Sequence, residues 1–242
     1  MTVDCQNCPL RDCEGFQPMT DDTVHFMRRF KKGELQAEPG TQIMTQGSSS
    51  THLFTCLEGQ GVRYKDLPNG ERQVISFVLP GDFIGLQAGV MGEMTHSVEA
   101  TTEMTLCTFN RSDFWNLFKE QPARGFDITR IAALEECFLG EALAVIGQLK
   151  ARARVAWALW RFQTRLEEVC EVTDGHVPLP FKQQDLADAV GLSLVHTNKT
   201  LARLREDQIA TWSDGWLTVH DPERLAAEAA VADCETTPRP LI

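Results

Sequence analysis

The pattern that most constrains this chain is a pair of short amphipathic segments joined by a glycine turn, between Gln183 and Arg205. Gly191 can take the left-handed conformation that ends a helix, and Ser193 can cap the helix that follows. Two helices joined by so short a turn predict a helix-turn-helix. The side chains expected to face its core are Leu186, Ala187, Val190, Leu194, Thr197, Leu201 and Leu204.

The outward face of the second predicted helix is mostly polar and carries no acidic side chain. Its stretch of the chain contains Lys199, Arg203 and Arg205, although the formal net charge of the whole chain is -11. A small basic surface on an acidic protein suits a specific site on DNA, with the helix in the major groove. A helical hairpin that binds protein is the alternative. The candidate DNA-contacting residues are Ser193, Val195, His196, Asn198, Lys199 and Arg203.

A second local signal follows the helix-turn-helix. Asp214-Gly215 lies between two short apolar runs within residues 210–219. Asp-Gly tolerates the positive φ angles of a tight hairpin turn, so these runs predict a two-stranded wing.

Earlier in the chain, the pattern changes from strands to helices. Between residues 27 and 113, short apolar runs alternate with turn signals such as Pro39-Gly40 and Pro80-Gly81. Regularly spaced strands of this kind predict a small β-barrel or roll. Apolar residues then recur at helical spacing towards residue 150, which predicts one long helix. Its narrow seam suits pairing with a second copy of the chain, the alternative being packing on the roll. The seam residues are Ile128, Ile131, Leu134, Phe138, Ala142, Val145 and Leu149.

The cysteines are concentrated at the start of the chain, where Cys5, Cys8 and Cys13 account for three of the eight. No apolar run approaches the roughly 20 residues that a membrane span needs, and the N-terminus lacks the apolar core of a secretory signal. We therefore expect a cytoplasmic protein with no membrane partner. In that compartment clustered cysteines indicate metal or redox chemistry rather than a disulfide scaffold.

Over nearly its full length the chain resembles the CRP/FNR family of bacterial transcription regulators. The matching stretches are Gly59 with residues 73–77, residues 79–85, the long helix and residues 184–192. The resemblance implies an α+β fold with an N-terminal β-roll like those of cyclic-nucleotide-binding domains, a long dimerisation helix and a C-terminal winged helix-turn-helix. The expected segments are a cysteine-bearing tail (1–20), the roll (21–121), the long helix (122–150), the DNA-binding domain (151–230) and a disordered tail (231–242).

Members of this family that bind cyclic AMP use a glutamate for the ribose and an arginine-serine pair for the cyclic phosphate. Here those positions fall on Leu86 and on His96-Ser97. Without the arginine a buried phosphate would lack its partner, so we do not expect cyclic AMP as a ligand.

The oxygen-sensing FNR branch holds a [4Fe-4S] cluster on three N-terminal cysteines and one from the roll. By this resemblance the ligands would be Cys5, Cys8, Cys13 and Cys107, although x4 replaces the usual x5 before Cys13 and Pro9 follows Cys8. Zinc on the same four thiolates, a thiol–disulfide switch and bystander thiols are the alternatives. Cys56 is the reserve fourth ligand, Cys137 and Cys170 are expected as packing residues, and Cys234 as part of the tail.

The resemblance therefore implies a homodimeric regulator that senses oxygen, redox state or nitric oxide, binds an inverted repeat in double-stranded DNA and works with RNA polymerase. A regulator of the same fold without a cluster is the alternative. A metal-dependent enzyme of cupin-like fold is not expected, because His25, His52 and His96 are scattered without a close pair.

The recognition helix also departs from the FNR pattern. FNR-like helices carry a glutamate, a serine and an arginine where this chain has Val195, Asn198 and Lys199. Valine cannot accept a hydrogen bond from cytosine but can touch a thymine methyl, and lysine reaches guanine as a point charge. We therefore expect an operator that differs from the usual FNR site.

Overall fold

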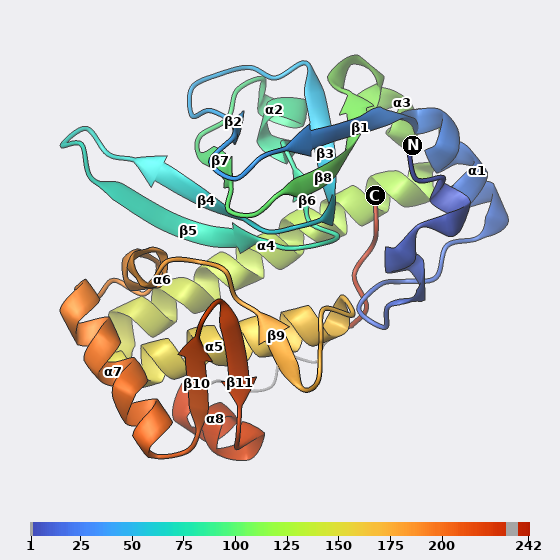
Figure 1. Ribbon diagram of the computed structural model, residues 1–242. Helices are drawn as coiled ribbons and strands as arrows, with labels where there is room; N and C mark the ends of the chain where they lie inside the picture. The colour runs from blue at the N-terminus through green and yellow to red at the C-terminus, as the bar shows by residue number, and fades with distance from the viewer. Residues whose placement is uncertain (1, 231–236) are drawn as a thin grey trace. The chain divides into compact units, whose positions relative to one another are not determined.

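The protein is described here as a computed structural model, which covers residues 2–230 and 237–242 (Figure 1). The chain divides into two compact units. Unit 1 comprises residues 1–133 together with 238–242, and unit 2 comprises residues 134–237. Among the described residues, no helix combines the length and apolar character needed to cross a membrane.

Unit 1 is built from two antiparallel sheets of four strands each, in the orders β1-β8-β3-β6 and β2-β7-β4-β5 (Figure 1). The predicted roll is confirmed, because each of the longer apolar runs forms a strand. The strands are β1 Lys31–Ala37, β2 Gln42–Met44, β3 His52–Glu58, β4 Gly61–Asp66, β5 Arg72–Val78, β6 Phe83–Ile84, β7 Ser97–Ala100 and β8 Met104–Asn110.

Alternating side chains from both sheets of unit 1 form one apolar core. It contains Met44 of β2, Val98 of β7 and Leu106 of β8, each nearly inaccessible to solvent. Cys56 of β3 is fully buried in this core. Because a side chain of this strand faces the interior between sheets, Cys56 behaves as a small apolar residue.

A second, aromatic cluster lies where the helices of unit 1 meet the roll. Phe30 stacks on Phe109 with ring centroids 5.1 Å apart, and Ile128 of the long helix packs in the same cluster. Cys5 and Cys107 pack against its edge. The helices of this region are α1 Asp21–Phe30, α2 Leu86–Met91, α3 Phe114–Glu120 and α4 Pro122–Gln148.

The long predicted helix is confirmed as α4, and its pairing with a second copy of the chain stays a prediction. Ile128 is buried in the aromatic cluster of unit 1, and in unit 2 Phe138 stacks on Trp157 at 6.1 Å. These two seam residues thus contact other residues of the same chain. Leu139 and Leu143, 49% and 73% exposed, remain open beside it.

Unit 2 packs helices around a small antiparallel sheet of order β10-β11-β9. Phe162 of α5 stacks on Phe181, in the connection between β9 and α6, with ring centroids 5.5 Å apart. The elements are α5 Ala151–Glu168, β9 His176–Pro178, α6 Gln183–Ala189, α7 Leu194–Glu206, β10 Ala210–Ser213, β11 Trp216–Val219 and α8 Pro222–Ala229.

The C-terminal residues differ from the disordered tail expected for 231–242. Pro238–Ile242 belongs to unit 1, and Leu241 and Ile242 are 4% and 5% exposed. Residues 231–236, including Cys234, lie outside the described residues.

Candidate functional site

The helix-turn-helix is formed by local backbone signals. The backbone N–H of Lys182 donates to Asp185 Oδ2 at 3.1 Å, which fixes the start of α6. Gly191 has φ +63° and ends that helix. The Ser193 hydroxyl oxygen then accepts from the backbone N–H of His196 at 3.3 Å and caps α7. Both expectations for the turn, a left-handed glycine and a serine cap, are therefore confirmed.

The inner side of the motif agrees with the sequence pattern at five of its seven positions, and Leu201 is half-buried. Thr197 and Leu204 of α7 are fully buried, as are the three inward residues of the first helix. Leu194 is 37% exposed, so its predicted inward position is wrong. It is the first residue of α7, where no preceding turn covers the side chain. Thr200, which the pattern missed, is buried and donates to the His196 carbonyl at 2.9 Å.

The outer side of α7 presents every predicted DNA-contacting residue to solvent. Val195 is 64% exposed, although its side chain is apolar, so it is available to contact a partner. Figure 1 shows α7 beside α6 within unit 2, with its outer face free of other elements of that unit. The other exposed candidates are Ser193, His196, Asn198, Lys199 and Arg203. Such a face can lie in a major groove.

The predicted wing is present as the hairpin of β10 and β11. Asp214 and Gly215 both have positive φ, +53° and +79°, as the tight turn requires. The Trp212 indole N–H donates to the Leu179 carbonyl at 2.9 Å and holds the hairpin against the chain that precedes α6. The third strand, β9, was not predicted, since three residues between turns give too short a period to recognise.

One arginine that sequence reasoning missed ties unit 2 together behind the recognition helix. Arg152 of α5 makes two hydrogen bonds of 2.9 Å to the Glu228 carboxylate and an ion pair of 2.7 Å with Asp207. Asp207 follows the end of α7, and Glu228 lies in α8. The bidentate geometry fixes three helices relative to one another.

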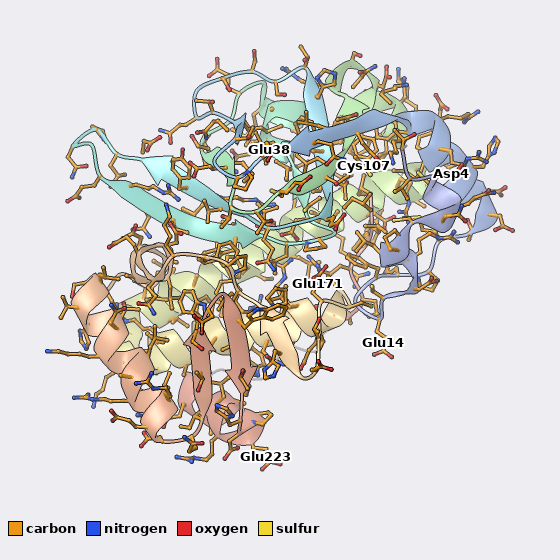
Figure 2. The ribbon with its side chains drawn as sticks, in the orientation of Figure 1. Asp4, Glu14, Glu38, Cys107, Glu171 and Glu223 are labelled. Carbon is orange, nitrogen blue, oxygen red and sulfur yellow. The ribbon has the colours of Figure 1, made fainter. Side chains whose placement is uncertain are left out.

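Three of the four predicted metal-ligating cysteines line one pocket in unit 1. Cys5 and Cys8 come from the N-terminal segment, and Cys107 comes from β8. Figure 2 shows Cys107 in the sheet, near the segment that carries Asp4. The pocket has a free volume of about 40 Å³ and a lining that is almost wholly apolar. The fold therefore places in one pocket three of the cysteines that were predicted together, although Cys107 is about a hundred positions from the other two.

A buried ion pair holds the N-terminal segment beside Cys107. The Lys31 ammonium donates to Glu34 Oε1 at 2.6 Å and to the Val3 carbonyl at 2.7 Å. The Val3 backbone N–H donates to the same Glu34 oxygen at 2.8 Å. The Lys31 ammonium also acts electrostatically on the Cys107 thiol. The pair thus connects the segment bearing Cys5 and Cys8 to the sheet.

The environment of these thiols keeps them protonated at neutral pH. Burial raises the pKa of Cys107 to about 11, although the neighbouring Lys31 ammonium opposes the shift. Burial also raises the pKa values of Cys5 and Cys8. A thiol held in the neutral form is a poor nucleophile.

The remaining cysteines fall elsewhere. Cys13 is 5% exposed, does not line the pocket, and is the one predicted ligand that is not a free thiol. Cys56, the reserve ligand, is fully buried in the core between the sheets. Cys137 and Cys170 are exposed, so their expected packing role is wrong.

The donor chemistry of the pocket suits a thiolate-bound metal, but its arrangement does not complete one. Cys5, Cys8 and Cys107 supply three free sulfur atoms in an apolar setting, which soft and borderline metals prefer. Within residues 2–230 and 237–242, no three His, Cys, Asp or Glu side chains converge closely enough to hold a metal ion. A fourth sulfur would require Cys13 to be reduced and brought to the pocket.

A β-roll, a long helix and a winged helix-turn-helix in one chain define the class of DNA-binding transcription regulators that carry a signal-receiving domain. Residues 34–121 match the family model of the cyclic nucleotide-binding domain, and residues 153–228 match that of the Crp-like helix-turn-helix domain. The chain belongs to the CRP/FNR family of transcription regulators.

Relatives and solved structures agree with this assignment. The nitrogen fixation regulation protein FixK of Bradyrhizobium diazoefficiens is 30% identical over 191 residues, 79% of each chain. The transcriptional activatory protein AadR of Rhodopseudomonas palustris is 29% identical, over 92% of this chain and 97% of the relative. The structure of FixK2 from Bradyrhizobium japonicum has a TM-score of 0.75 at 23% identity, and covers 83% of this chain and 98% of its own. The homologues and fold relatives are regulators, and the chain is not an enzyme.

Proposed function

We propose that the protein is a homodimeric regulator that reads an inverted repeat through α7 and changes its DNA affinity with oxygen, nitric oxide or redox state. The observation that carries the DNA-binding part is the capped α7, whose exposed face is polar and basic. Transcription takes place in the cytoplasm of a bacterium, and RNA polymerase is the partner implied by relatives named as transcriptional activators.

The dimer would place two copies of α7 about 34 Å apart, one turn of DNA, so that each reads one half-site. Leu139 and Leu143 of α4 supply exposed apolar surface for that contact. Lys199 would donate to a guanine and Val195 would touch a thymine methyl. The preferred half-site should differ from one read by a glutamate and an arginine at these positions.

The operator test compares one matched pair of variants. In vitro selection would first identify the preferred site of the wild-type dimer. Fluorescence anisotropy would then measure its affinity for that site and for the standard FNR operator. Val195→Glu should raise the relative affinity for a half-site with cytosine at the contacted position, whereas Val90→Glu, on exposed α2, should change neither affinity. Selection of the standard FNR operator by the wild-type protein would contradict the proposal.

We propose that the signal enters at the cysteine pocket. Cys5, Cys8 and Cys107, with Cys13 as the fourth ligand, would hold a [4Fe-4S] cluster, which supplies iron that reacts with oxygen or nitric oxide. The Lys31–Glu34 pair holds the N-terminal segment at Cys107. Because Cys107 packs on the aromatic cluster that includes Ile128, movement at the pocket would reach the first turns of α4.

Anaerobic purification followed by absorption spectroscopy, with iron and sulfide analysis, tests the cluster. We expect a broad charge-transfer band that bleaches in air and is lost in Cys5→Ser and Cys107→Ser. Cys137→Ser, on an exposed thiol of unit 2, is the matched control and should keep the band. A colourless anaerobic protein with stoichiometric zinc would overturn this part.

The second candidate is a regulator of the same fold with zinc or a thiol switch in place of the cluster. It is favoured by the position of Cys13, which lies outside the pocket and is not a free thiol. If the regulator instead has no metal or switch at these cysteines, and is constitutively dimeric or senses a small ligand in the roll, Cys5→Ser and Cys107→Ser would leave anaerobic DNA binding unchanged. Cyclic AMP remains an unexpected ligand, because Leu86, at the glutamate position, packs on the aromatic cluster and offers no acceptor to a ribose.

A further inference from the structure

The chain returns to unit 1 after the DNA-binding elements and adds a short extended segment there. The Arg239 backbone N–H donates to the Gly15 carbonyl at 2.7 Å, and its carbonyl accepts from the Gln17 N–H at 2.8 Å. This is a parallel bridge between Phe16 and Arg239. In Figure 1 the segment, in red, ends near the blue N-terminal region. The segment around Arg239 thus pairs with the backbone at Phe16 in the way that an added strand pairs with an exposed strand edge.

The side chain of Arg239 anchors the segment to the roll. Its guanidinium pairs with Asp82 Oδ1 at 3.0 Å and lies 5.3 Å from the centre of the Phe16 ring. The Asp82 side chain is only 3% exposed, and its other oxygen accepts from the Leu79 N–H at 3.0 Å. A carboxylate this deeply buried requires a cation, and Arg239 provides it.

The turn beside Asp82 is shaped around Phe16. Gly81 has φ +84°, and a Cβ built on it would lie 2.0 Å from Phe16 Cζ. Only glycine therefore lets this ring sit under the guanidinium of Arg239.

The last two residues reach the cysteine pocket. The Leu241 carbonyl accepts from Arg124 Nη1 at 2.9 Å, and the Ile242 carbonyl accepts from the Thr55 hydroxyl at 2.5 Å. Both side chains line the pocket together with Cys5, Cys8 and Cys107, and Ile242 packs in the aromatic cluster. The three cysteines are therefore covered on one side by the end of the segment.

We propose that unit 1 carries a peptide-binding groove whose ligand is the chain's own segment Pro238–Ile242, and that the bound segment closes the cysteine pocket. The groove recognises an extended peptide with an arginine followed, two and three residues later, by aliphatic side chains. Asp82 selects the arginine, and the apolar pocket takes Leu241 and Ile242. Binding restricts the access of solutes to the thiols whether or not a metal is bound, so the proposal does not depend on the cluster.

The test measures how fast each cysteine is alkylated in the reduced, metal-free protein, by iodoacetamide labelling and mass spectrometry. Deleting residues 238–242 should speed labelling of Cys5 and Cys107 by about tenfold or more, since protection reflects the opening of covering structure. Cys137 is the internal reference and should label at an unchanged rate. Arg239→Ala should act in the same direction, while Arg224→Ala, an exposed arginine of unit 2, should have no effect.

A rescue experiment separates loss of a ligand from loss of folding. The synthetic peptide Thr-Pro-Arg-Pro-Leu-Ile, added to the deletion variant, should restore protection of Cys5 and Cys107, and the same peptide with alanine for arginine should not. If the deletion variant does not fold, judged by circular dichroism and thermal melting, the full-length Arg239→Ala and Ile242→Ala variants decide. Unchanged labelling in a folded variant, or equal effects of the two peptides, would overturn the proposal.

Discussion

The helix-turn-helix and the cysteine pocket are assembled in opposite ways. The first is a contiguous stretch, α6 to β11, in which each cap and turn is set by residues a few positions away. The second draws on the N-terminal segment, β1, β8 and the last residues of the chain. A surface built locally should tolerate changes elsewhere in the chain, whereas a pocket built from distant segments should respond to changes in any of them.

The largest expected effect tests the local unit through its core. Leu204→Ala removes a fully buried side chain of α7, and a cavity of this kind costs about 2–5 kcal/mol. Urea unfolding followed by circular dichroism measures the loss. Leu143→Ala on exposed α4 is the control, with a change near zero in a monomeric sample. Equal losses would mean that α7 is not supported by its own unit.

A somewhat smaller effect is expected on the DNA-binding surface. Lys199→Glu places an acid on the exposed face of α7, and loss of one base contact plus repulsion should weaken DNA binding roughly 100-fold. Anisotropy titrations at fixed salt give the affinity. Lys119→Glu makes the same charge change on α3 and should preserve affinity. A similar weakening by both variants would mean that only net charge matters.

We expect the free energy of unfolding to depend on pH because of the Cys107 thiol in the pocket. Burial raises the pKa of Cys107 to about 11, from 9.0 for an ordinary thiol. Between these values the unfolded chain has lost the proton and the folded chain keeps it, so folding stability falls as pH rises from 9 to 11. The contribution is about 1–2 kcal/mol.

Urea unfolding of the metal-free protein at pH 8 and pH 10.5 measures that loss. Cys107→Ala should reduce it, and Cys137→Ala should not. A loss of equal size in the wild-type protein and Cys107→Ala would refute the assignment to this thiol.

The smallest effect concerns a single cap. Ser193→Ala removes the hydroxyl that accepts from the His196 N–H, at a cost of about 1 kcal/mol. Thermal melting should show a modest decrease. Ser48→Ala, which affects a hydroxyl in a turn of unit 1, is the matched comparison. If both changes leave the melting temperature intact, the cap adds nothing to the stability of α7.

The sequence predicted the locally determined parts well. Gly191 and Asp214-Gly215 act through their own backbone conformation, and the Ser193 hydroxyl accepts from an N–H three residues later, so the turn and the wing followed without knowledge of the rest of the fold. Leu194 was placed wrongly because periodicity alone does not show that the first residue of a helix has no preceding turn to cover its side chain. Cys107 was associated with Cys5 only through a family resemblance, since no local pattern connects positions so far apart.

Contacts between segments far apart in the chain could not be predicted from such local signals. The period of α4 identified its apolar seam but did not show that one seam residue, Phe138, stacks on Trp157 of the same chain. Residues 238–242 are polar and proline-rich in their first half, which is typical of a tail. Their burial depends on Asp82 and Thr55, whose roles become visible only once the roll is folded.

The division of the chain has a consequence for biosynthesis. Unit 1 begins with the first residues and is finished by residues 238–242, so the whole of unit 2 is translated in between. At roughly 5–20 residues per second, that takes on the order of 5–20 s. During this interval the nascent roll lacks Arg239 beside Asp82 and lacks the segment that lines the cysteine pocket. The pocket is thus completed only when the ribosome has made the DNA-binding elements.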